Sequence, residues 1–240
     1  TSPLVADGDA LGCLARWRLA RSGADDVELM NGSIELNPDG AALGRVALAA
    51  AYLASDLPQS ALSTVETAIR SLEPTAKYDF IDFQNLALAR ALQAVILIVQ
   101  NQNEKALETA ESAVGADPAS TAARIALSYA QQARFDLEGA RTSLEEAVKV
   151  KPDNALAWAR LAEIQSSFGE YDKSLEAAQK AASLDPNVAR TQTVLGFAYL
   201  TQVKTKESRE AFEKAIALDQ ADYLSRLGLG LTKIRDGDLR

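Results

Sequence analysis

Three prolines separated by equal intervals constrain the fold of this chain more than any other feature. Pro118, Pro152 and Pro186 stand 34 residues apart, and the stretches between them align without a gap. An alanine stands five residues before each of these prolines. Self-similarity at such a fixed period indicates an array of short repeats, each of which packs on its neighbours, rather than a single globular core.

Each repeat is expected to form two antiparallel helices. In residues 154–168, and again in 171–184, apolar and small residues recur at helical spacing (i, i+3, i+4, i+7). Gly169 lies between these two segments, where a glycine ends a helix because it takes a left-handed conformation without steric cost. Pro186 prevents the second helix from continuing. Alanine and serine at fixed positions let the two backbones approach closely.

This pattern resembles the tetratricopeptide repeat (TPR). The residues that match the family signature best are Trp158, Leu161, Ala162, Gly169, Tyr171, Ala181 and Pro186. The next repeat departs from the signature at Val203, where glycine is usual. The resemblance implies an all-α fold, a right-handed α-solenoid of antiparallel helix pairs.

The repeat register divides residues 1–240 as a single TPR array. The expected segments are a degenerate N-terminal repeat at 7–41, a repeat at 42–75, an insertion at 76–86 that extends the next helix, repeats at 87–120, 121–154, 155–188 and 189–222, and a truncated repeat at 223–240 with only its first helix. The extended helix should run from about Tyr78 to Gln100. Residues 27–36 are compatible with helix or with a β-hairpin around Asn31-Gly32. We expect the natural protein to be longer.

Composition disfavours several kinds of partner and chemistry. The net charge of −8 and the pI near 4.8 argue against nucleic acid, because phosphate contacts require a basic surface. No apolar run approaches the length of a membrane span, so we expect no membrane insertion. The chain has no histidine and one cysteine, Cys13, so we expect no enzyme activity and no cofactor or metal. The compartment, cytoplasmic or periplasmic, stays open.

Gly228 and Gly230 loosely resemble part of a phosphate-binding loop, but they lack its spacing and lie in a helical register. We interpret both glycines as positions of close helix packing. Leu227, Leu231 and Ile234 of the truncated repeat would pack on a further helix, so we expect the last helix to fray or to self-associate.

In TPR arrays the first helices of successive repeats line a concave groove, and the resemblance implies one here. The expected groove residues are Val95, Ile98, Val99, Ile125, Tyr129, Gln132, Glu163, Arg190, Phe197 and Leu200. Such a mostly apolar groove suits a protein or peptide partner that presents an apolar strip or an amphipathic helix. Family members that bind the acidic tails of chaperones use basic residues and asparagine at these positions, and their scarcity disfavours that ligand.

We therefore expect a protein–protein interaction scaffold that binds a peptide or an amphipathic helix. Two alternatives remain open at this point. The chain could be a structural or assembly subunit of a bacterial envelope or export machine, or an accessory domain of a larger multidomain protein, because one fold hosts many functions.

Overall fold

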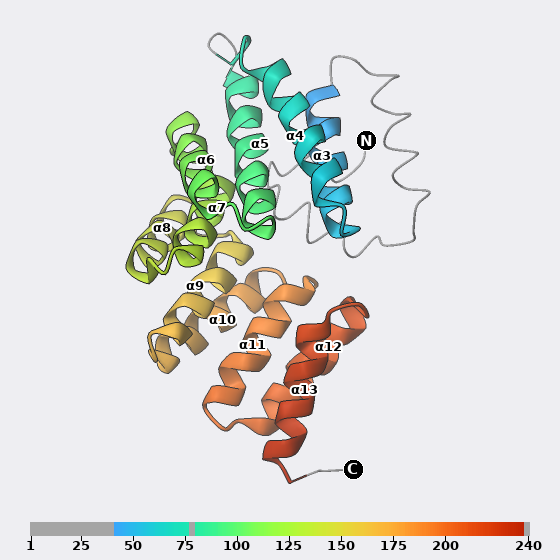
Figure 1. The fold of residues 1–240 in the computed structure, drawn as a ribbon. Helices are drawn as coiled ribbons and strands as arrows, with labels where there is room; N and C mark the ends of the chain where they lie inside the picture. Colours follow the sequence, from blue (N-terminus) through green and yellow to red (C-terminus); the bar gives the residue numbers. More distant parts are fainter. Residues whose placement is uncertain (1–40, 77–79, 238–240) are drawn as a thin grey trace. The chain divides into compact units, whose positions relative to one another are not determined.

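All regular secondary structure in the described part of the protein is helical. This computed structural model describes residues 41–76 and 80–237, which form eleven α-helices and no strand (Figure 1). The expected all-α class and the antiparallel helix pairs are confirmed. Most of the degenerate repeat at 7–41, with Cys13 and the choice between helix and hairpin at 27–36, lies outside the described residues.

The chain forms two compact units that divide between Val150 and Lys151. The described helices of the first unit are α3 (Ala41–Ala54), α4 (Pro58–Leu72), α5 (Phe80–Val99), α6 (Asn103–Ala116), α7 (Thr121–Ala133) and α8 (Leu137–Val150). Helices α3, α5 and α7 each pair with the helix that follows, and they also pack on one another in series. Buried alanines along these helices allow this close packing.

Helix α5 lies at the centre of the first unit. It includes the last part of the extra sequence before the 87–120 repeat and packs against α3, α4, α6 and α7. Its segment Ile81–Val99, with a mean hydropathy of 1.4, is long and apolar enough to cross a membrane. The expectation that no apolar run reaches that length is therefore wrong. Half of the segment is buried inside the protein, with Leu92 and Ile96 almost inaccessible, so packing between helices accounts for its composition.

The second unit repeats the same arrangement. Its helices are α9 (Ala155–Ser167), α10 (Tyr171–Leu184), α11 (Ala189–Thr201), α12 (Thr205–Leu218) and α13 (Tyr223–Arg235). Helices α9, α11 and α13 pack in series, while α10 and α12 each contact the helices before and after them in the chain. Side chains cap two of the helix starts: Asn154 accepts from the amide of Ala157 at 2.9 Å, and Asp222 accepts from that of Leu224 at 3.0 Å.

The turns after the first helix of each repeat share one backbone feature. Each contains a residue with positive φ, and these residues are Asp56, Asn101, Phe135, Gly169, Val203 and Gly237. From Asn101 onward they follow the 34-residue period. Only two of the six are glycine, the residue that takes positive φ without steric cost. The turn geometry therefore persists even where the side chain is unfavourable for it.

Phe212 of α12 fills the space between α11 and α13. Its ring is fully buried, and a Cβ added to Gly196 or Gly228 would overlap it. Close packing is thus confirmed as the reason for a glycine at 228. For Gly230 that interpretation is wrong within the described residues, because no atom lies within 4 Å of the position its Cβ would take.

Candidate functional site

In the first unit, the expected groove residues lie on two helices that pack side by side, α5 and α7. Val95 and Ile98 of α5 are half-buried against the alanine-rich core, whereas Val99 is 57% exposed. On α7, Tyr129 and Gln132 are half-buried. Ile125 is buried and therefore lies beneath this surface.

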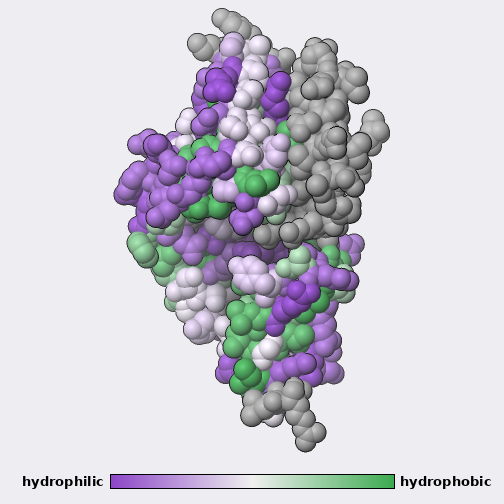
Figure 2. All heavy atoms as spheres, turned by 45° about the vertical axis from the view of Figure 1, so that its right-hand side comes forward, coloured by the Kyte–Doolittle hydropathy of each residue, from purple (hydrophilic) through white to green (hydrophobic). Residues whose placement is uncertain are grey.

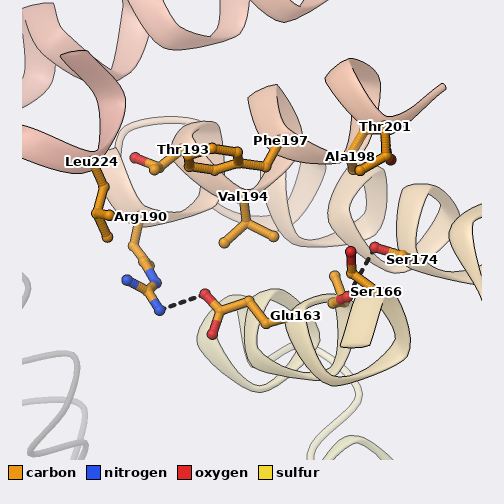
Figure 3. Close-up of a pocket in the computed structure, with 11 residues that line it drawn as sticks. Glu163, Ser166, Ser174, Arg190, Thr193, Val194, Phe197, Ala198, Thr201 and Leu224 are labelled. Atoms are coloured by element: carbon orange, nitrogen blue, oxygen red, sulfur yellow. Dashed lines mark hydrogen bonds and ion pairs between the residues drawn. The ribbon is translucent and has the colours of Figure 1, made fainter. Parts of the chain in front are cut away.

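In the second unit, three expected groove residues lie around one hollow of about 340 Å³ (Figure 3). They are Glu163 on α9 and Arg190 and Phe197 on α11. The complete lining consists of Ala162, Glu163, Ser166, Ser174, Arg190, Thr193, Val194, Phe197, Ala198, Thr201 and Leu224. Leu200 of α11 is buried and does not line it.

An ion-pair network borders the hollow. The guanidinium of Arg190 pairs with the carboxylate of Glu163, and the two side chains point toward one another in Figure 3. Arg160, which is buried, donates to the same carboxylate at 2.9 Å. One carboxylate thus joins two arginines on neighbouring helices. A buried charge is strongly destabilising when it is unpaired, so the bond to Glu163 offsets the cost of burying the guanidinium of Arg160.

The apolar part of the hollow is held in place by aromatic packing. The rings of Phe197 and Phe212 meet edge to face, with centroids 4.9 Å apart and an interplanar angle of 79°. This is a favourable geometry for two aromatic rings. Phe212 is itself fixed between two glycines, so Phe197 has a rigid support.

A cluster of hydroxyl and carboxylate groups fixes the start of α13 against α11. The Thr193 hydroxyl lies 2.9 Å from Oδ2 of Asp222 and 2.7 Å from the Ser225 hydroxyl, which donates to the same Oδ2 at 2.7 Å. Asp222 also caps α13 through its other oxygen. These bonds place Leu224 at the edge of the hollow.

Sequence reasoning missed part of this lining. Leu224 stands 34 residues after Arg190, so extending the groove register by one period would have found it. Val194 lies next to Thr193 on α11 and also lines the hollow, although it does not occupy one of the expected groove positions. Nothing in the sequence singles out Arg160 as the second partner of Glu163.

Among the described residues, no group of acidic, cysteine or histidine side chains could hold a metal ion.

Comparison with known proteins places the chain among repeat proteins. Two family profiles described as tetratricopeptide repeat match residues 132–196 and 189–222. The chain is 32% identical over 142 residues to the small glutamine-rich tetratricopeptide repeat-containing protein 2 of Saccharomyces cerevisiae. That alignment covers 58% of this chain and 41% of the yeast protein, so the chain spans less than half of that relative.

Solved structures resemble the fold at lower sequence identity. A thermophilic TPR protein from Thermus thermophilus superposes with a TM-score of 0.66 at 20% identity, covering 80% of this chain and 99% of its own. PilF of Pseudomonas aeruginosa superposes with a TM-score of 0.56 at 19% identity, covering 63% of this chain and 69% of its own. These likenesses concern the fold alone.

Proposed function

The chain is a tetratricopeptide repeat protein, and we propose that it acts as an interaction scaffold whose second unit binds a peptide segment of a partner protein in the hollow bordered by α9, α11 and α13. Repeat arrays of this kind present extended surfaces to binding partners. The observation that carries the proposal is the combination of an apolar hollow with a charged pair at its border.

The lining suits one apolar side chain held beside a polar backbone. Val194, Phe197 and Leu224 offer apolar contact in a space of about 340 Å³, a volume at the lower end of small-ligand pockets. Arg190 and Glu163 supply a donor and an acceptor at the border, which match the carbonyl and amide groups of a peptide. A peptide whose large apolar residue enters the hollow would satisfy both kinds of contact.

Five of the six expected groove residues of the first unit, all except the buried Ile125, form part of the same proposal, as a second contact surface on α5 and α7. Exposed Val99 with half-buried Val95 and Ile98 offers apolar area there. The assembly-subunit and accessory-domain alternatives stay predictions, since the likeness to PilF extends to the fold alone.

The test is selection of binding peptides followed by measurement on variants. Peptides would be selected on the purified chain from a random phage-displayed library, and their dissociation constants measured by calorimetry. Arg190→Gln removes the charge at the border but leaves the Arg160–Glu163 pair in place. Loss of a hydrogen bond to a charged group amounts to about 1.5–3 kcal/mol, so binding should weaken about tenfold or more.

Lys180→Gln is the matched control, because Lys180 is exposed on α10 and does not line the hollow. It should bind the selected peptides as the unchanged chain does. Leu224→Ala should weaken binding through lost apolar contact. Peptides that bind all three variants with unchanged affinity would refute the hollow as the binding site.

A further inference from the structure

Phe135, in the turn between α7 and α8, is an exposed aromatic residue held in an unfavourable backbone conformation. Its φ is 64°, in the left-handed region that bulky residues rarely adopt. The side chain is 92% exposed, more than any other large hydrophobic side chain within residues 41–76 and 80–237. One period earlier the same turn position holds Asn101, a residue type that tolerates positive φ. Neither the backbone nor burial favours a phenylalanine here, and strain of this kind is typical of functional positions.

The turn that carries Phe135 is firmly held. The amide of Phe135 donates to the carbonyl of Gln132 at 2.9 Å. The carboxylate of Asp136 accepts from an amide in the first turn of α8 at 2.9 Å. Arg134 forms an ion pair with Glu104 of the neighbouring helix α6. Because this backbone is already ordered, little conformational freedom is lost when the ring binds a partner.

The surroundings of the ring are polar. Figure 2 shows the first unit, in the upper part of the view, as largely hydrophilic or neutral with small separate hydrophobic areas. A single exposed hydrophobic residue is common on a protein surface, but Phe135 is also strained. The adjacent Asp136 and the net charge of −8 disfavour the anionic surface of a membrane as its partner. A pocket in a protein suits the ring better.

The hollow of the second unit offers such a pocket. Val194, Phe197 and Leu224 line it, and its volume of about 340 Å³ is at the lower end of small-ligand pockets, which suits a single large side chain (Figure 3). An entering phenylalanine would meet the ring of Phe197. Paired aromatic rings stabilise a contact beyond the area that they bury.

The charged borders of the two surfaces are also complementary. Arg190 and Glu163 border the hollow, and Arg134 and Asp136 flank Phe135 in the chain. Each border carries one positive and one negative group, so one orientation of the entering turn sets opposite charges against each other. Such an arrangement fixes the orientation of binding more than it adds affinity.

We propose that Phe135 of one copy of this chain binds in the hollow of a second copy, so that the chain associates with itself head to tail. The inference rests on the proposed function, because the turn of the second copy takes the place of the peptide segment in the hollow. The two surfaces differ, so a pair joined by one contact retains an unfilled hollow and an unbound Phe135. Further copies can therefore add, as at other heterologous contacts.

Two complementary variants test the proposal. Phe135→Asn removes the ring, installs the residue type found one period earlier and keeps the hollow intact. Thr201→Trp fills the hollow from an exposed position on α11 and keeps Phe135. In sedimentation velocity, the average mass of the unchanged chain should rise with concentration, whereas each variant alone should stay monomeric. An equal mixture of the two variants should form a 1:1 dimer and stop there, because it contains one intact contact.

Val203→Asn is the matched control. Val203 occupies the same turn position two periods after Phe135, is also strained and exposed, and does not line the hollow. Val203→Asn and Phe135→Asn should both unfold at a higher temperature than the unchanged chain, because both relieve backbone strain. Only Phe135→Asn should abolish association. Leu224→Ala should weaken association about tenfold through lost apolar contact.

Association that Phe135→Asn leaves unchanged, or a mixture of the two variants that stays monomeric, would overturn the inference. An unchanged chain that is monomeric at every concentration would also overturn it. If that monomer still bound the selected peptides in the hollow, the proposed function would stand without this inference. Attachment to phosphatidylcholine vesicles that Phe135→Asn abolishes would assign the ring to a lipid surface and equally overturn the proposal.

Discussion

Val203 adopts a backbone conformation that opposes its side chain. Its φ is 61°, in the left-handed region, where an L-residue with a branched Cβ is strained by about 1–2 kcal/mol. The side chain is 58% exposed, so it gains little from burial in return. Val203→Gly should therefore raise the free energy of unfolding by about 1 kcal/mol, measured by urea denaturation.

Gly169 offers the reciprocal change, because it occupies the same turn position one period earlier with a φ of 75°. No neighbouring atom would meet its Cβ, so the main effect of Gly169→Val is the backbone strain of a branched residue at positive φ. This variant should lose about as much stability as Val203→Gly gains. Equal stability of all three proteins would contradict the strain argument.

Gly228 and Gly230 should respond in opposite directions to the same substitution. Gly228→Ala drives a Cβ into the Phe212 ring and should destabilise the protein by about 1–3 kcal/mol. Gly230→Ala places the same group in open space and should stabilise the helix by up to about 1 kcal/mol. Thermal unfolding of the two variants measures both effects, and a loss of stability in the Gly230 variant would contradict this account.

At the scale of the elements, most helix positions could be predicted from the repeat period. The segments expected at 154–168 and 171–184 correspond to α9 and α10, and the expected end of α10 at Leu184 is the observed one. These predictions succeed because glycine, proline and capping residues mark helix ends locally. The partners of buried side chains are harder to predict. Phe212 meets glycines on two other helices, and their contact depends on how the helices cross.

The same distinction applies to the candidate site. The period identified Glu163, Arg190 and Phe197 because they occupy repeated positions on first helices. It did not identify Arg160. This residue pairs with Glu163 three positions further along α9, and the repeat period does not predict such a contact within one helix. Sequence periodicity therefore predicts which face a residue occupies better than it predicts which side chains bond to each other.

The contact between α12 and α13 should weaken in acid. Hydrogen bonds from the side chains of Thr205 and Arg209 lower the pKa of Asp236 below its ordinary value of 3.8. A carboxyl group with a lowered pKa stabilises the folded state above pH 3.8, and this contribution is lost as the pH falls through the lower folded value. Asp236→Asn should thus destabilise the protein at pH 7 by a small amount, since the pair is partly exposed.

Urea denaturation at pH 7 and pH 3 measures the effect of this substitution. The difference between Asp236→Asn and the unchanged chain should shrink at the lower pH. Asp153→Asn, in the exposed turn before α9, provides the control and should leave stability nearly unchanged at pH 7. A difference for Asp236→Asn that is the same at both pH values would contradict the assignment.

At the scale of the whole molecule, the division after Val150 leads to a prediction about folding. Helices α9–α13 pack on one another and enclose their own buried cluster. Because each repeat packs on its neighbours, a fragment of residues 151–240 should keep its helices when expressed alone. Far-UV circular dichroism with cooperative thermal unfolding would show this, whereas a disordered fragment would mean that residues 1–150 are required.

The packing of Phe212 limits how such an array can evolve. One period earlier, the corresponding residues are Ala162, Ala178 and Val194, so an alanine stands there with an alanine and a valine, whereas Phe212 sits between Gly196 and Gly228. The largest of the three side chains therefore lies on a different helix of the set in each repeat: it is Val194 in the earlier set and Phe212 in the later one. Duplicating or exchanging a single repeat would place a phenylalanine against an alanine or a valine. Gene duplication and repeat shuffling in this chain are therefore expected to succeed only when the three positions move together.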